Sequence, residues 1–209
     1  MTNKQKTAGI IFDMDGTLVD SQLDFNAMRA EMELPAGQPI LESLDKLDPA
    51  RRVACDVILA RHEAAGAVCA TLITGVAEML SIVQSQKIKM AIVTRNSRMT
   101  TDKTLARLNV AQHFDPILTR ECGPQKPDPW SILQICQQWK LDPKEVVMVG
   151  DFHFDLITGN NAGCPSVLYT GGRLKTEIEG HYLADYYVDS FQEIDSWLAW
   201  LAWLASATS

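Results

Sequence analysis

The sequence predicts an α/β protein whose core is a parallel β-sheet with helices on both faces. Short apolar runs with the composition of buried strands alternate with segments whose apolar residues recur at helical spacing. This alternation is typical of parallel sheets, because a helix usually connects each strand to the next. The predicted strands are residues 9–12, 90–94, 116–119, 146–150, 166–169 and 186–188, and the predicted helices among them are residues 76–83, 100–108 and 129–139.

One stretch near the amino terminus, residues 21–74, interrupts this alternation. It contains no convincing strand, and its pattern predicts helices over residues 24–32, 40–46 and 49–65. Asp48 and Pro49 mark a helix start, because Asp accepts a hydrogen bond from an orphan amide and Pro suits the first helical position. We therefore expect two domains: an α/β core of residues 1–20 and 75–209, and a helical insert of residues 21–74.

Composition and charge exclude several classes of protein. Of the 209 residues, 46% are hydrophobic and 22% are charged, which excludes a disordered or collagen-like chain. The net charge of −7 argues against a general nucleic-acid binder but allows a small phosphorylated substrate. No segment approaches the roughly 20 apolar residues of a membrane span. Five scattered cysteines without a CxxC pair favour free thiols, so we expect a cytoplasmic protein.

The segment GIIFDMDGTLVDS, residues 9–21, places two carboxylates at the end of the first predicted strand. Asp13 and Asp15 follow an apolar run, and Gly16 and Thr17 come next. The carboxyl ends of parallel strands open onto the crevice where ligands bind. If the backbone bends there, the two carboxylates converge on one ligand, one as nucleophile and the other as proton donor. A surface turn that uses either Asp only as a cap is the competing interpretation.

The segment VVMVGDFHFDLITGNNAG, residues 146–163, repeats this arrangement. Asp151 follows a predicted strand, and Asp155 stands at an expected helix start, where an N-cap is the competing interpretation. If both strands face one crevice, the clustered carboxylates repel one another, and a divalent cation such as Mg²⁺ is the simplest remedy. The candidate metal-binding residues are Asp13, Asp15, Asp151 and Asp155.

Two further segments carry candidate phosphate-binding residues. Thr94 ends the predicted strand in AIVTRN, and its hydroxyl suits a phosphoryl oxygen, although a β-branched residue is also ordinary at a strand end. Lys126 lies between prolines in GPQKPDP, where a stiff loop suits a fixed positive charge; a solvated lysine is the alternative. Arg95 and Asn96 are further candidates for substrate binding, and a surface charge is the alternative for Arg95.

Together these segments resemble the haloacid-dehalogenase-like (HAD) hydrolase superfamily. The resemblance covers essentially the whole chain in the order DMDGT, Thr94, Lys126 and GDFHFD, and the spacing after Asp155 is similar to the phosphoglycolate-phosphatase branch. Phe152 departs from the pattern, since many relatives carry a small hydroxyl residue there. The resemblance implies a Rossmann-like parallel sheet core with an inserted all-helical cap that closes over the site and selects the substrate.

The resemblance also implies a role for each residue. Asp13 would attack phosphorus to form an aspartyl-phosphate, while Asp15 would protonate the leaving oxygen and later activate water. Asp13, the backbone carbonyl of Asp15 and Asp151 would hold Mg²⁺, with Asp155 orienting them. The implied catalytic residues are Asp13, Asp15, Thr94 and Lys126, and the phosphoryl group would be bound by Thr94 and Lys126.

Two alternatives remain beside a Mg²⁺-dependent phosphatase of a small phosphorylated metabolite. A sugar-phosphate mutase would use the same core residues but return the phosphoryl group to its substrate. A non-enzymatic interaction module would use an apolar patch on a helix predicted over residues 191–204, which carries Trp197, Trp200 and Trp203. A pure binding role predicts the loss of at least one catalytic residue, and none is missing.

Overall fold

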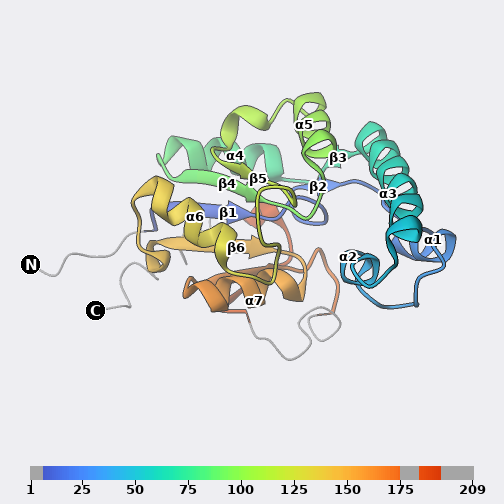
Figure 1. Cartoon of the computed structure of the whole chain (residues 1–209). Helices are drawn as coiled ribbons and strands as arrows, with labels where there is room; N and C mark the ends of the chain where they lie inside the picture. Colours follow the sequence, from blue (N-terminus) through green and yellow to red (C-terminus); the bar gives the residue numbers. More distant parts are fainter. Residues whose placement is uncertain (1–6, 175–183, 194–209) are drawn as a thin grey trace, which may run out of the picture. The chain divides into compact units, whose positions relative to one another are not determined.

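A computed structural model describes residues 7–174 and 184–193 of the chain, and its largest feature is a parallel β-sheet (Figure 1). Its six strands lie in the order β5-β4-β1-β6-β7-β8. The predicted α/β fold is confirmed, and the strand bounds differ from the expected ones by at most one residue at either end. The strands are β1 (Gly9–Phe12), β4 (Lys89–Val93), β5 (Ile117–Leu118), β6 (Val146–Gly150), β7 (Ser166–Tyr169) and β8 (Tyr186–Val188).

The strand order makes β1 the point at which the chain changes direction across the sheet. The chain runs from β1 outward through β4 to β5, and then returns to the other side of β1 for β6, β7 and β8. Ile10 of β1 pairs with Met90 of β4 on one side and with Val147 of β6 on the other. In such sheets the crevice for ligands opens beyond the carboxyl ends of the strands at this switch point.

Helices cover both faces of the sheet, α4 and α5 on one and α6 and α7 on the other (Figure 1). On the α6 and α7 face, Ile11 and Met148 of the sheet pack with Ile132, Ile135 and Ala162 in one buried apolar cluster. The helices are α4 (Val76–Ser85), α5 (Arg98–Arg107), α6 (Trp130–Trp139) and α7 (His153–Ala162), with 3₁₀ turns η1 (Ala111–His113), η2 (Pro143–Glu145) and η3 (Phe191–Glu193). Residues 194–204 of the last predicted helix lie outside the described residues.

A second, two-stranded antiparallel sheet lies where the chain leaves and re-enters the core. It pairs β2 (Val19–Asp20) with β3 (Thr71–Leu72). By its internal contacts the chain forms two compact units, residues 21–70 and residues 1–20 with 71–209. β3 was not predicted, because a strand of two residues is too short to show alternation. The expected insert therefore extended to residue 74, four residues beyond the compact unit.

The smaller unit is all-helical and has its own core. Asp48 caps its longest helix as expected, because Oδ1 accepts hydrogen bonds from the amides of Ala50 and Arg51 at 3.1 Å. None of the helices in the described part of the chain is both long and apolar enough to cross a membrane. The helices are α1 (Phe25–Glu31), α2 (Ile40–Leu44) and α3 (Pro49–Cys69). Their shared core comprises Met28, Met32, Leu34, Ile40, Leu44, Cys55 and Leu59.

The packing of α6 on the sheet predicts a contrast between two aliphatic residues of that helix. Ile135 is fully buried, whereas Leu133 is 42% exposed. Ile135→Ala should lower the free energy of unfolding by about 2–5 kcal/mol, because it removes buried methyl groups and leaves a cavity. Leu133→Ala should change it by less than about 1 kcal/mol. Urea denaturation monitored by circular dichroism measures both, and equal losses would contradict this packing.

Candidate active site at the carboxyl edge of the sheet

The backbone bends sharply just after β1, and this bend places Asp13 and Asp15. The amide of Asp13 donates to the carbonyl of Val149 at 2.8 Å, which fastens the end of β1 to β6. Beyond it, the amide of Leu18 returns to the carbonyl of Met14 at 2.9 Å. Asp13 and Asp15 therefore stand on a tight loop, as their convergence on one ligand requires.

A buried lysine connects two of the predicted aspartates. Lys126, in the loop between β5 and α6, donates from Nζ to Oδ1 of Asp13 at 2.5 Å and to Oδ1 of Asp155 at 2.7 Å. Lys126 is only 4% exposed, Asp13 9% and Asp155 1%. This burial rules out the solvated surface lysine that the sequence left open. Because a buried charge is stable only with hydrogen-bonded partners, the three groups depend on one another.

Asp151 follows β6 and has partners that the sequence analysis missed. Nη2 of Arg173 donates to Oδ2 of Asp151 at 3.0 Å and to its backbone carbonyl at 3.3 Å. Thr17 Oγ1 donates to Oδ1 of Asp151 at 3.4 Å. Thr17 could have been suspected from its place in DMDGT, whereas Arg173 lies 22 residues after Asp151 in a turn with no distinguishing pattern.

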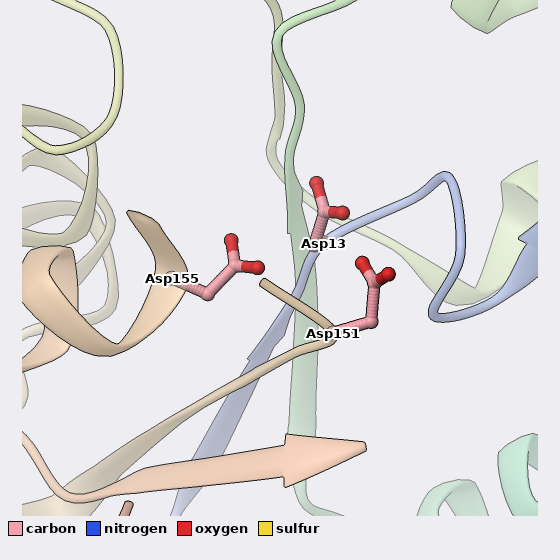
Figure 2. Close-up of side chains that lie close together, drawn as sticks. All are labelled: Asp13, Asp151 and Asp155. Atoms are coloured by element: carbon pink, nitrogen blue, oxygen red, sulfur yellow. The ribbon is translucent and has the colours of Figure 1, made fainter. Parts of the chain in front are cut away.

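Three of the four predicted metal-binding residues form one cluster of carboxylates. Asp13 from the end of β1, Asp151 from the end of β6 and Asp155 from the first turn of α7 each offer an oxygen, and these oxygens lie within 4.8 Å of one another. Figure 2 shows the three side chains gathered from these separate segments. Since β1 and β6 are neighbouring parallel strands, Asp13 and Asp151 lie close together at their carboxyl ends.

The shared burial of these groups changes their acidity. Burial raises the pKa of Asp13 to about 6, although the charge of Lys126 opposes the shift. Burial raises the pKa of Asp151 to about 7, with the charges of Asp13 and Asp155 adding to it and Arg173 opposing it. Burial alone would lower the pKa of Lys126, but Asp13 and Asp155 outweigh it and the pKa is raised. Burial is thus the main cause of the raised pKa values of both carboxyl groups.

Two glycines allow the carboxylates to approach the backbone. A Cβ atom at Gly16 would lie 2.3 Å from Oδ2 of Asp151, and one at Gly150 would lie 2.1 Å from Cγ of Asp155. Gly16 also has a φ of +80°, which side chains rarely adopt. Both glycines thus leave the space in which the acidic side chains of the cluster stand.

Asp15 has hydrogen-bond partners different from those of the carboxylate cluster of Asp13, Asp151 and Asp155. Asn96 Nδ2 donates to Oδ2 of Asp15, and the Asn96 amide donates to Thr94 Oγ1 at 3.1 Å. Thr94 and Asn96 are both buried at the end of β4, which pairs with β1 in the sheet. The structure thus brings Asn96 to Asp15. The side-chain carboxylate of Asp15 is not one of the three clustered groups.

Aromatic side chains surround the start of α7. The rings of Phe152, His153 and Phe154 contact one another, and the His153 centroid lies 4.0 Å from that of Phe152 and 4.5 Å from that of Phe154. The guanidinium of Arg95 lies over the Phe154 ring, with Cζ 4.8 Å from its centroid. Burial lowers the pKa of His153, and the charge of Arg95 adds to this effect. His153 is therefore a half-buried ring whose surroundings favour its neutral form.

The donor set fits a hard divalent cation. Carboxylate oxygens are the ligands that Mg²⁺ prefers in proteins, and Asp13, Asp151 and Asp155 supply three within reach of one another. The raised pKa values of Asp13 and Asp151 point the same way, because a nearby cation would favour the ionised carboxylates that burial disfavours. The residues present are thus compatible with the predicted Mg²⁺.

Comparison with known proteins agrees with this geometry. The family model described as haloacid dehalogenase-like hydrolase matches residues 10–169, and these residues contain Asp13, Lys126 and Asp151. This chain belongs to that family. A haloacid dehalogenase-like hydrolase domain-containing protein of Arabidopsis thaliana is 34% identical over an alignment that covers 93% of this chain and 85% of the relative. The predictions of the family and of a hydrolytic enzyme are confirmed.

Two further similar proteins share less sequence identity with this chain. The N-acetylmuramic acid 6-phosphate phosphatase of Pseudomonas aeruginosa is 25% identical, with 91% of this chain and 94% of the relative covered. The crystal structure of a predicted phosphoglycolate phosphatase from Haemophilus somnus superposes with a TM-score of 0.75 at 23% identity, and covers 92% of this chain and 97% of its own. That likeness shows the shared HAD fold.

The raised pKa of Asp151 predicts a pH-dependent difference in stability between the wild type and Asp151→Asn, measured in EDTA. In the folded protein this carboxyl titrates near 7, whereas the ordinary value is 3.8, so the folded state holds more protons between these pH values. Stability that depends on the protonated carboxyl is therefore lost as the pH rises from about 4 to about 8.

The asparagine variant lacks this titration, so its free energy of unfolding relative to wild type should increase over that range. Urea denaturation at pH 5 and pH 8 gives the difference. The matched variant Asp102→Asn, at an exposed position of α5, should show a much smaller change. A wild-type minus Asp151→Asn difference that is independent of pH would contradict the raised pKa.

Proposed function

We propose that this protein is a Mg²⁺-dependent phosphatase that hydrolyses a small phosphate monoester through an aspartyl-phosphate on Asp13. The observation that carries the proposal is the arrangement around Asp13. Lys126 binds one oxygen of its carboxylate, two further carboxylates lie beside it, and a second aspartate follows on the same loop. The family, and a relative that is named as the phosphatase of a sugar phosphate, support the same reaction.

Asp13 acts as the nucleophile in the first step. Lys126 holds Oδ1, so Oδ2 is the oxygen that bonds to phosphorus while the bond from phosphorus to the leaving oxygen breaks. Asp15 gives its proton to the leaving oxygen, which departs as an alcohol. The hydrogen bond from Asn96 to Oδ2 of Asp15 supports this role, because it orients the carboxyl group.

The second step releases phosphate. Asp15, now ionised, takes a proton from a water molecule, whose oxygen bonds to phosphorus while the Asp13 to phosphorus bond breaks. This step regenerates the free carboxylate of Asp13, forms inorganic phosphate and leaves Asp15 protonated again. The covalent intermediate divides one difficult displacement into two easier ones.

Thr94 and Lys126 bind the phosphoryl group. Thr94 Oγ1 already accepts a hydrogen bond from the Asn96 amide, so its own proton is directed elsewhere and suits a phosphoryl oxygen. Lys126 contributes a fixed positive charge from inside the protein. Positioning and charge stabilisation of this kind account for most catalysis of phosphoryl transfer.

Asp13 and Asp151 would hold the Mg²⁺ with the backbone carbonyl of Asp15, and Asp155 would orient the set through Lys126. When bound, the ion supplies positive charge that offsets the charge on the phosphoryl oxygens. We further propose that the helical unit is the cap that selects the substrate. We propose the cytoplasm as its location, which the five free cysteines support.

Replacement of the nucleophile tests the mechanism. Asp13→Asn should lower turnover of p-nitrophenyl phosphate by at least about a thousandfold, because an amide does not attack phosphorus. Release of inorganic phosphate measures the rate, and Asp102→Asn on the exposed face of α5 is the matched control. Residual activity of the Asn variant near the wild-type rate would reject Asp13 as nucleophile.

Removal of divalent cations tests the metal site. EDTA should stop turnover and added Mg²⁺ should restore it. Independently of activity, Mg²⁺ should raise the melting temperature of the wild type by several degrees in a thermal-shift assay, since binding to the folded state stabilises it. Asp151→Asn should lose most of this shift and Asp102→Asn should keep it. Equal shifts in all three proteins would place the cation elsewhere.

A further inference from the structure

Arg173 places a positive charge directly on one of the carboxylates proposed to hold the cation. Its Nη2 donates to Oδ2 of Asp151 at 3.0 Å and to the backbone carbonyl of the same residue at 3.3 Å. Asp151 follows β6, and Arg173 lies in the turn that follows β7, the neighbouring parallel strand. The carboxyl ends of these two strands therefore bring the guanidinium to the carboxylate cluster.

The turn that carries Arg173 is fixed on the end of the sheet. The amide of Thr170 donates to a carbonyl of β8 at 2.9 Å, and the Thr170 carbonyl accepts the Arg173 amide at 3.0 Å. Gly171 and Gly172 have φ values of +58° and +82°, which residues with a side chain rarely adopt. The Thr170 carbonyl also accepts a hydrogen bond from Nε of Arg173 at 2.9 Å. Both the backbone and the side chain of the turn thus direct the arginine to Asp151.

Burial separates Arg173 from Lys126, a second basic residue paired with the cluster. The side chain of Lys126 is 3% exposed, whereas that of Arg173 is 46% exposed. Removing a buried ammonium from its carboxylates would leave an unpaired charge inside the protein. A half-exposed guanidinium loses little when it leaves, because water replaces its partner and exposed ion pairs contribute little to stability. Of these two residues, Arg173 is therefore the one that a bound cation can displace.

A divalent cation and Arg173 draw on the same negative charge. The guanidinium on Oδ2 offsets the charge of the Asp151 carboxylate, and two positive charges a few ångströms apart repel each other. Oδ1 of Asp151 accepts a hydrogen bond from Thr17 at 3.4 Å, so each carboxylate oxygen has a donor within the protein. Because a carboxylate oxygen has two lone pairs, the conflict between the arginine and a cation is one of charge more than of space.

We propose that Arg173 lowers the affinity of the site for Mg²⁺, because its guanidinium and the cation compete for the charge of Asp151. This inference rests on the proposed Mg²⁺-dependent function and deepens it. Arg173 acts through Asp151 and takes no part in the chemical steps. It keeps the cation exchangeable at a site whose three carboxylates would otherwise hold it more tightly.

Calorimetry of Mg²⁺ binding tests the competition without turnover. The full-length protein is treated with EDTA, dialysed and titrated with MgCl₂. Arg173→Gln should lower the dissociation constant about tenfold or more, because it removes the competing charge. Arg173→Lys, which keeps the charge, should have a dissociation constant nearer to that of the wild type than to that of Arg173→Gln. Arg107→Gln, which removes an equal charge from the exposed end of α5, should bind Mg²⁺ as the wild type does.

A thermal-shift assay separates competition from a merely structural role of Arg173. In EDTA, Arg173→Gln should melt at or slightly below the temperature of the wild type, because it loses a half-exposed ion pair. Mg²⁺ should then raise the melting temperature of this variant by more than it raises that of the wild type. If Arg173 served only to hold Asp151 in place, its removal would weaken Mg²⁺ binding and reduce the shift.

Unchanged or weaker Mg²⁺ binding by Arg173→Gln would overturn the competition. If the wild type binds Mg²⁺ in the same titration, the metal site and the proposed function stand and only the role of Arg173 is rejected. Absence of Mg²⁺ binding in both the wild type and Arg173→Gln would reject the metal site and the competition together. Hydrolysis of p-nitrophenyl phosphate reports the phosphatase function separately.

Discussion

A buried lysine held between two buried carboxylates is the interaction on which the site depends. Lys126 comes from the loop after β5, Asp13 from the end of β1 and Asp155 from the first turn of α7. Removing one member would leave an unpaired charge inside the protein, at a cost of about 3–5 kcal/mol. The arrangement therefore fastens three distant segments at the crevice of the sheet, and it orients Asp13.

The balance of charge around this lysine explains why the site suits a cation and an anion in turn. Three carboxylates face two basic side chains, Lys126 and Arg173, and burial keeps the pKa values of Asp13 and Asp151 raised. A divalent cation would complete the neutralisation. The phosphoryl group would then meet the cation, Lys126 and the Thr94 hydroxyl on one side of the site. Gly16 and Gly150 leave the space that the side chains of Asp151 and Asp155 need to lie this close to the backbone.

Most of the fold was predictable because its elements carry local signals. β1, β6, β7 and β8 have the expected bounds. The first three are fully buried, and such parallel strands are continuous apolar runs. Asp48 and Pro49 marked the start of α3, because capping is a contact between neighbours in the sequence. β3 was missed because its two residues become a strand only by pairing with β2, and nothing within the segment reports that partner.

The candidate site also has features that the local sequence predicts and features that depend on tertiary contacts. From the sequence alone we could name the candidate side chains and predict that Asp13, Asp15 and Asp151 follow strand ends, because residue type and strand position are local properties. Three contacts could be found only in the folded chain: Lys126 is buried against Asp13, Arg173 binds Asp151, and Arg95 lies over Phe154. These contacts join residues 22 to 113 positions apart, and their stability comes from burial and charge pairing, which exist only once the chain has folded.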